Sequence, residues 1–208
     1  MPAVPLAETL LAAGRLIGQV IGGRTLDAAL AAARLPAEIR PAAMDHAYGA
    51  LRRYGRGDFL LACLLHQPLK EPALHGLLLA ALARLEARPE EAHTIVNQAV
   101  AAAARLAKGN FRGLANAVLR NFLRRKQELV ERAAADEEAR WQHPAWWLAK
   151  LRRDHPDRWQ EIAEAGNGHP PMTLRVNRRR SDVAAYAAEL AAAGIAGRAL
   201  DDAAILLE

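Results

Sequence analysis

The stretch Leu106–Arg132, LAKGNFRGLANAVLRNFLRRKQELVER, decides how the first part of the chain folds. Its apolar residues recur at the three- and four-residue spacing of one helix face. These residues are Phe111, Leu114, Ala115, Val118 and Phe122. The pattern predicts one long helix that buries this face against other helices.

A second side of the same stretch carries polar and basic residues four positions apart, which places them in one slowly drifting stripe. The stripe consists of Arg112, Asn116, Arg120 and Arg124, and no acidic residue lies on it. From Arg105 to Arg132 there are eight Lys or Arg against two Glu, a net charge of +6, whereas the whole chain carries only +5. The positive charge is therefore concentrated here. A solvated helix face explains such a run as readily as a surface that binds an anionic partner.

The turn GNFRG lies at the start of the stripe and favours the binding interpretation. Gly109 and Gly113 leave backbone N–H groups open beside Lys108 and Arg112. Backbone N–H groups at the start of a helix, next to cationic side chains, suit a phosphate group. We expect a phosphate contact at this turn.

The residues before this stretch predict further helices joined by short turns. The expected helices span residues 4–22, 25–33, 42–55, 59–67, 72–87 and 89–107. Thr25 and Asp58 are expected to cap helices, and Pro72 and Pro89 to open them. Six or seven helices before residue 140, without strand-like alternation, predict a compact α-helical domain over residues 1–136.

The composition changes after the polar, acidic segment 133–140. All four tryptophans lie between Trp141 and Trp159, and tryptophans this dense indicate an interdomain joint or a small core, with base stacking as the alternative. We expect Trp146, Trp147 and Trp159 to be packed there.

Alternation of period two appears only near the end of the sequence. MTLRVN (172–177), GRAL (197–200) and AILL (204–207) predict strands, with a helix capped by Ser181 between the first two. A small α+β domain is therefore expected over residues 141–208. It is expected to be incomplete, because the sequence stops inside a strand.

Few residues indicate a catalytic, cofactor or metal site. The one cysteine, Cys63, lies in an apolar run and is expected to be a buried thiol, and the seven histidines lack metal-ligand spacing. We predict no catalytic, cofactor-binding or metal-ligating residue. The sequence shows neither 18 uninterrupted apolar residues nor a basic leader, so a cytoplasmic protein without a membrane span is expected.

Two stretches resemble known families. RGLANAVLRNFLRR, with the preceding AHTIVNQAVAAAARL, resembles the NusB fold, an all-helical RNA-binding module. The segment HPAWWLAKLRRDHPDRWQEIAEAGNGHPPMTLRVNRRRSD resembles the next part of the bacterial RsmB, or Sun, family. In that family a NusB-like domain is followed by a small α+β RNA-binding domain and a Rossmann-like methyltransferase domain, which makes 5-methylcytosine in small-subunit ribosomal RNA.

The resemblance implies an RNA-recognition region without chemistry of its own. The family's two catalytic cysteines and its S-adenosylmethionine site belong to a domain expected after Glu208, so this chain alone should bind no cofactor and be inactive. Its expected partners are small-subunit ribosomal RNA and the missing methyltransferase domain, with no metal. The candidate RNA contacts are Lys108, Asn110, Arg112, Asn116, Arg120, Arg124, Arg125, Arg175, Asn177 and Arg178.

Two other functions remain open at this point. One is a transcription antitermination factor of NusB type, which would bind RNA together with a ribosomal protein. The other is a helical scaffold that binds only proteins. Both RNA-binding functions predict RNA affinity that falls steeply with salt, whereas the scaffold predicts almost none. Standalone NusB has no counterpart of residues 141–208, which favours the methyltransferase interpretation.

Overall fold

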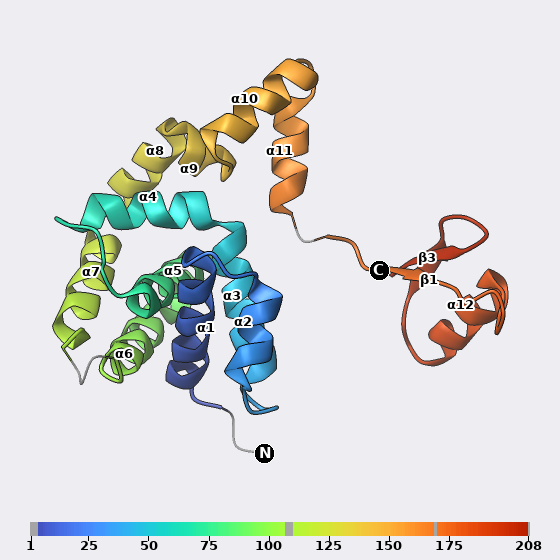
Figure 1. Cartoon of the computed structure of the whole chain (residues 1–208), viewed down its shortest axis with the longest axis horizontal. Coiled ribbons are helices and arrows are strands. Elements are labelled where there is room, and N and C mark those ends of the chain that lie inside the picture. The colour runs from blue at the N-terminus through green and yellow to red at the C-terminus, as the bar shows by residue number, and fades with distance from the viewer. Residues whose placement is uncertain (1–3, 107–109, 169, 208) are drawn as a thin grey trace. The chain divides into compact units, whose positions relative to one another are not determined.

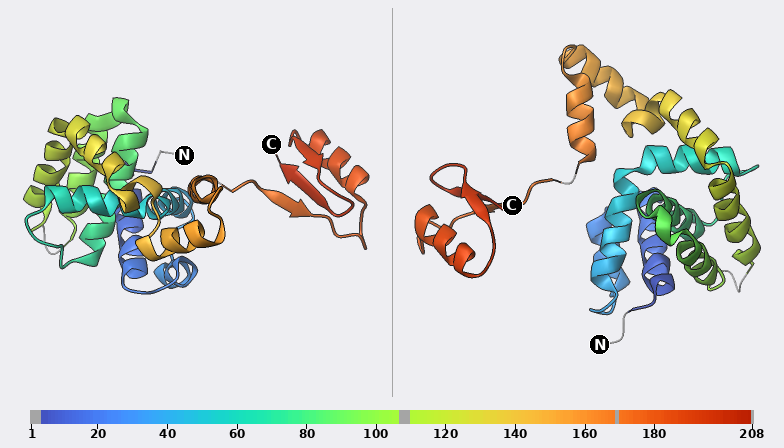
Figure 2. Two further views of the ribbon diagram at one scale, coloured as in Figure 1. Left: turned by 90° about the horizontal axis from the view of Figure 1, so that it is seen from above. Right: turned by 180° about the vertical axis from the view of Figure 1, so that it is seen from behind.

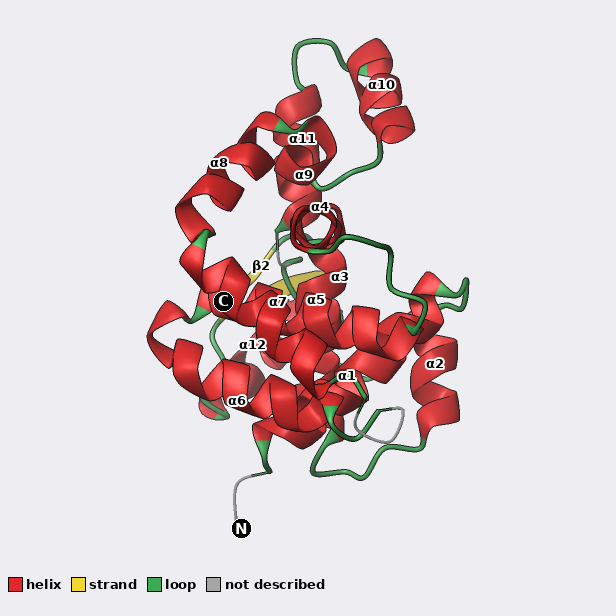
Figure 3. Cartoon of the chain, turned by 90° about the vertical axis from the view of Figure 1, so that its left-hand side faces the viewer, coloured by secondary structure: helices red, strands yellow, loops and turns green. Residues whose placement is uncertain are grey.

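The computed structural model describes residues 4–106, 110–168 and 170–207. The chain divides into two compact units, Met1–Asn167 and Gly168–Glu208 (Figure 1). The first is helical and the second combines a small sheet with one helix, which confirms the predicted mainly helical fold class (Figure 3). The helices of the bundle are α1 (Leu6–Ile21), α2 (Leu26–Ala33), α3 (Arg40–Arg52), α4 (Tyr54–Leu64), α5 (Pro72–Ala87), the short 3-10 helix η1 (Pro89–Glu91), α6 (Ala92–Ala103), α7 (Arg112–Arg124) and α8 (Lys126–Ala135).

The centre of the bundle is the contact between α1 and α5, with α3 and α6 beside α1 (Figure 1). Three glycines bring the two backbones close together. A Cβ atom on Gly14 would lie 2.8 Å from the Cβ of Leu77, and one on Gly18 would lie 2.7 Å from the carbonyl carbon of Pro72. A Cβ on Gly76 would collide with the backbone oxygen of Gly14. Because no other residue fits these positions, the glycines set the spacing of the core.

Two helix starts follow from the predicted local signals. The hydroxyl of Thr25 accepts a hydrogen bond from the backbone N–H of Ala28, and Pro72 occupies the first turn of α5, as predicted. The predicted cap at Asp58 is wrong. Helix α4 already begins at Tyr54, and the Asp58 carboxylate inside it lies 2.8 Å from Nε2 of His75 on α5.

The predicted long basic helix is two helices. Arg125 has φ −107° and ψ 16°, away from helical values, and separates α7 from α8. The break turns α8 so that Leu129 and Ala133 are buried where α8 packs on α4. Leu114 was predicted to be buried but lies at the edge of the apolar face and is 38% exposed. Together with α9, the break gives more helices before residue 140 than the six or seven predicted.

The tryptophan-rich segment forms a separate small core on α9 (Glu137–Trp141), α10 (Ala145–Asp154) and α11 (Trp159–Asn167). The rings of Trp141 and Trp159 meet edge to face with centroids 4.9 Å apart. Leu148 and Leu151 of α10 are buried beside them. The expected packing of Trp146 is wrong, because its side chain is 69% exposed.

The second unit is a three-stranded antiparallel sheet in the order β1–β3–β2, with α12 packed against it (Figure 2). Its elements are β1 (Thr173–Arg175), α12 (Val183–Ala192), β2 (Gly197–Ala199) and β3 (Ala204–Leu207). All three predicted strands are present. Leu174 faces Ile205 across β1 and β3, and Ile205 is buried with Val176 and Leu190 in the core of the unit. The cap of α12 is Asp182 and not Ser181, since the Asp182 carboxylate accepts from the backbone N–H of Ala185.

The compact helical unit extends past residues 137–140, where the sequence places the boundary between domains 1–136 and 141–208. Asp136 caps α9 through the backbone N–H of Ala139, and α9 packs against both α4 and α8. This contact joins the tryptophan core to the bundle. The domain division proposed from the sequence stays a prediction.

Candidate nucleic-acid interface

Helix α7 has one buried side and one cationic side. Ala115, Val118, Leu119 and Phe122 are buried against the bundle, and Phe122 is among its largest fully buried side chains. The remaining positions include Arg112, Arg120 and Arg124, whose side chains are all exposed. The helix is therefore held in place by residues other than its arginines.

The arginines of α7 are largely free to bind an external anion. Nε of Arg120 donates a hydrogen bond to Oδ1 of Asn116 at 2.8 Å, which leaves the two terminal nitrogens of the guanidinium unused. Arg112 and Arg124 form no hydrogen bond or ion pair with any residue that the structure describes. The half-buried Asn116 keeps its amide N–H groups available for a sugar or base contact.

The flanking cations are partly neutralised by acidic residues. Glu128 lies 2.7 Å from Arg125 and 3.6 Å from Arg132, and the hydrogen bond from Arg125 lowers the pKa of the Glu128 carboxyl. Arg105 lies 3.8 Å from Glu8, which α1 brings across the bundle. The predicted contact Arg125 therefore already has a partner, whereas the stripe on α7 has no acidic one among the described residues.

The predicted phosphate turn is only partly visible. Lys108 and Gly109 lie outside the described residues. Asn110 is exposed, and Phe111 precedes α7 without a side-chain cap on the helix N-terminus. The space beside Gly113 is open, with nothing described within 4 Å of where a Cβ would lie. The predicted contacts Lys108 and Asn110 stay predictions.

In the second unit, the predicted residues Arg175, Asn177 and Arg178 surround one cavity of about 420 Å³, together with Val176 and Ala203. Asn177 and Arg178 each have an internal partner. Oδ1 of Asn177 accepts from the backbone N–H of Arg179 at 3.1 Å, and Arg178 lies 3.0 Å from Asp202. Arg175 is exposed and has no side-chain partner within the described part of the chain.

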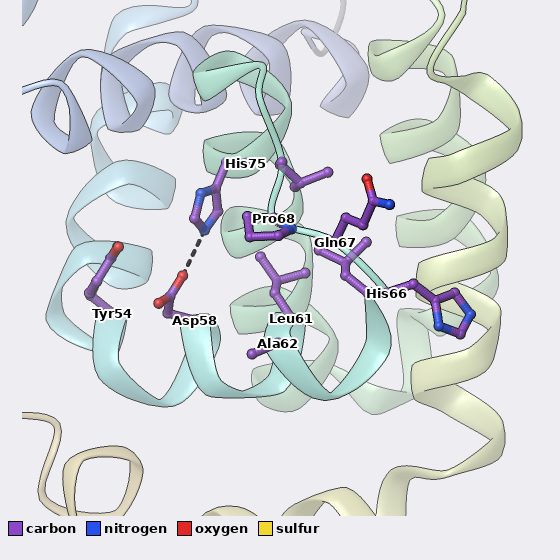
Figure 4. Close-up of a pocket in the computed structure, with 10 residues that line it drawn as sticks. Tyr54, Asp58, Leu61, Ala62, His66, Gln67, Pro68 and His75 are labelled. Atoms are coloured by element: carbon purple, nitrogen blue, oxygen red, sulfur yellow. Dashed lines mark hydrogen bonds and ion pairs between the residues drawn. The ribbon is translucent and has the colours of Figure 1, made fainter.

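One polar pair, Asp58 and His75, could not be predicted from the sequence. A cavity of about 420 Å³ between α4 and α5 contains the Asp58–His75 pair, with Tyr54 at one end and His66 at the other (Figure 4). Burial, and secondarily the Asp58 charge, raises the pKa of Tyr54. Asp58 and His75 are 17 residues apart on different helices, so no local sequence pattern indicates that their side chains meet. The residues that line this cavity include no serine or cysteine, so the pair alone is no nucleophile site.

The described residues give no other sign of a chemical centre. Cys63 is half-buried and packs against the core, where burial was expected. Within residues 4–106, 110–168 and 170–207, no cluster of three or more His, Cys, Asp or Glu side chains could hold a metal ion. In the same residues no helix is long and apolar enough to cross a membrane.

Each of the two parts of the chain matches a known protein family. Residues 11–124 match the family model of the NusB family. Residues 143–208 match that of the methyltransferase RsmF/B-like, ferredoxin-like domain.

Two relatives at 38% identity have the same name. The chain is 38% identical to the ribosomal RNA small subunit methyltransferase B of Vibrio cholerae, over 88% of this chain and 44% of that protein. It is also 38% identical to the protein of that name from Pseudomonas putida, over 91% of this chain and 44% of the relative. The chain thus spans less than half the length of these relatives.

A solved structure agrees on the fold. The crystal structure of the protein PH0851 superposes with a TM-score of 0.61 at 13% identity, covering 97% of this chain and 48% of the other. At this identity the likeness concerns the fold alone. From the helical bundle, the sheet that follows it and the two family matches, we conclude that the chain belongs to the NusB family and continues into an RsmF/B-like ferredoxin-like domain.

Proposed function

We propose that this chain is the RNA-recognition region of a ribosomal RNA cytosine-C5 methyltransferase. The observation that carries the proposal is the row of exposed arginines on α7, of which Arg112 and Arg124 have no partner within the described residues. Guanidinium groups with free donors bind phosphate oxygens in a forked geometry, and phosphate contacts position an RNA-binding protein. The identity to ribosomal RNA small subunit methyltransferase B supports ribosomal RNA as the anion.

The chemistry is assigned to the part of the relatives that this chain does not match. Methyl transfer from S-adenosylmethionine would occur there, so the proposed partners are small-subunit ribosomal RNA and that methyltransferase part. The proposed role places the protein in the cytoplasm, with its RNA. The candidate contacts in this chain bind and orient RNA and do not react with it.

The α7 row can be tested by removing its charge. Replacing Arg112, Arg120 and Arg124 together by Gln should weaken binding of a small-subunit ribosomal RNA fragment. The slope of log affinity against log salt should flatten by up to about two units, at roughly 0.7 for each single-strand phosphate that is no longer neutralised. Thermal melting should stay near wild type, because the buried side of α7 is untouched. The measurement is a salt titration of RNA binding for variant and wild type.

A matched control removes the same charge elsewhere on the bundle. Arg24, Arg34 and Arg40 are exposed and lie at α2 and α3, on the other side of α1 and α5 from α7 (Figure 1). Their replacement by Gln should leave the salt slope nearly unchanged. An unchanged slope in a folded α7 variant, or equal flattening in the control, would contradict an RNA surface on α7. The search would then move to Arg175 and its neighbours.

A second candidate function is transcription antitermination, which the NusB family match over residues 11–124 favours. It leaves the domain at 143–208 without a role. An antitermination factor should bind its RNA tightly only together with a ribosomal protein, whereas the proposed recognition region should bind ribosomal RNA alone. A purely protein-binding scaffold should show no salt-dependent RNA affinity in either assay.

A further inference from the structure

The solvent-facing side of α10 combines a tryptophan with cationic side chains. Trp146, Ala149, Lys150 and Arg153 follow one another at helical spacing, and all four are exposed. Leu148 and Leu151 occupy the opposite, buried side. The pattern leaves the four exposed residues on one continuous strip of the helix surface.

Trp146 differs from the other three tryptophans of the chain. Trp141 and Trp159 pack together, and each has an arginine over its ring, Arg140 at 4.8 Å and Arg152 at 4.2 Å from the centroids. These interactions occupy their aromatic faces. Trp147 packs against the same small core, whereas Trp146 is 69% exposed.

The aromatic contact of Trp146 leaves most of its indole uncovered. Its ring meets Trp147 at 66° with centroids 5.8 Å apart, an edge-type contact. Ala149, one helical turn further on, is too small to shield the ring. An exposed indole costs hydration free energy, and that cost is relieved when a flat partner covers it.

The charge next to this ring selects the chemistry of the partner. Lys150 lies four residues after Trp146, so their Cβ atoms are about 6 Å apart. Lys150 makes no ion pair among the residues described, and its charge acts on Asp154 only through space. Arg153 donates to both carboxylate oxygens of Asp154, so the strip keeps a net positive charge from Lys150. A partner must therefore present a flat ring beside an anion.

We propose that Trp146 stacks on a base of single-stranded RNA while Lys150 contacts a neighbouring phosphate. The inference rests on the proposed function, since it adds a second contact to the same RNA. A base and its phosphate supply the flat ring and the negative charge in one ligand. Stacking tolerates any base, so this contact adds affinity and not sequence readout.

Substitutions of Trp146 test stacking directly. The probe is a fluorescein-labelled, single-stranded fragment of small-subunit ribosomal RNA, and binding to the full chain is measured by anisotropy. Trp146→Ala should weaken binding about 5- to 150-fold, the range found when a stacked aromatic is removed. Trp146→Phe should keep most of the affinity, whereas Trp146→Leu, apolar but without an aromatic face, should behave like Ala.

Two further measurements separate stacking from packing. Lys150→Gln should flatten the salt slope by about 0.7, as expected for one phosphate contact. Melting temperatures of all Trp146 variants should stay close to that of wild type. A lowered melting temperature would show that the indole packs against protein, and full affinity in Trp146→Leu would show that binding needs no aromatic ring. Either result would overturn the stacking role.

The α7 variants distinguish this proposal from the function on which it rests. If wild type binds RNA and the α7 triple variant weakens it, while Trp146→Ala binds like wild type, stacking is wrong and the proposed function stands. If wild type binds no RNA at all, the proposed function itself fails. Loss of affinity in Trp146→Ala without any change in salt slope supports stacking.

Discussion

Arginines on α7 and arginines in the tryptophan core have the same charge but opposite surroundings. On α7, Arg112 and Arg124 extend into solvent without a described partner. In the core, Arg140 and Arg152 lie over tryptophan rings, and Arg152 also pairs with Glu137. The first pair has donors to offer to an external anion. In the second pair both guanidinium groups cover tryptophan rings, and the charge of Arg152 is also neutralised by Glu137.

This difference shows why a count of basic residues does not locate a binding surface. The segments 112–124 and 140–153 both carry clustered arginines in the sequence. Only their neighbours distinguish the two segments: Arg140 and Arg152 each pack over an indole, and Arg152 also lies beside a carboxylate. We therefore expect the two regions to respond differently to substitution.

The largest effect should come from the buried side of α7. Phe122→Ala should lower the free energy of unfolding by about 3 to 5 kcal/mol, because it leaves a cavity beneath the helix. Leu114→Ala, on the same helix but exposed, should cost about 0.5 kcal/mol or less. Urea unfolding of both variants measures the difference. Equal costs would mean that α7 is not anchored through Phe122.

The tryptophan core should show the next largest effect. Trp159→Ala should cost about 3 kcal/mol, near the lower end for a removed tryptophan because Trp159 is only half-buried. Trp146→Ala should change stability by no more than about 0.5 kcal/mol. Thermal melts monitored by circular dichroism compare them. A large destabilisation by Trp146→Ala would place this residue with the packed tryptophans.

The smallest effect, and the sharpest test of the comparison, should come from Arg152→Gln. This variant removes both the ring contact and the ion pair to Glu137, so its melting temperature should fall, but by less than that of Trp159→Ala. Its salt slope of RNA binding should match wild type. A flattened slope would break the comparison, because it would make a packed arginine a phosphate contact.

The fold class could be predicted because its signals are local. Apolar residues at helical spacing, the Thr25 cap and the proline at the start of α5 each act within one or two turns of chain. The strands near the end follow from alternation alone. None of these signals needs a residue distant in sequence.

The predictions are wrong where contacts with residues distant in sequence determine the local structure. Asp58 has the side chain of a helix cap, but His75 on another helix takes its carboxylate. No glycine or proline marks the break at Arg125, which lets Leu129 reach α4. Trp146 and Trp141 look alike in sequence, and only packing separates the exposed ring from the buried one.

The candidate RNA site was predicted in outline. The sequence predicts the stripe Arg112, Asn116, Arg120 and Arg124, and the structure keeps its three arginines on the exposed side of α7. Asp202 could not be predicted as the partner of Arg178, because the two residues are 24 positions apart. Glu128 lies three residues after Arg125, so that ion pair follows a local helical spacing which the prediction of Arg125 as an RNA contact left out. Whether these side chains contact RNA stays a prediction.

The glycines between α1 and α5 have a consequence for how the molecule assembles. Each glycine inside a helix costs about 1 kcal/mol of helix stability relative to alanine, so both helices are weakened by Gly14, Gly18 and Gly76. The compensating stabilisation comes from close packing of the two helices, and it is present only when their backbones are in contact. Neither helix should persist alone in a nascent chain. The bundle should begin to form once the ribosome has released α5, which makes the contact across some sixty residues the event that commits the chain to its fold.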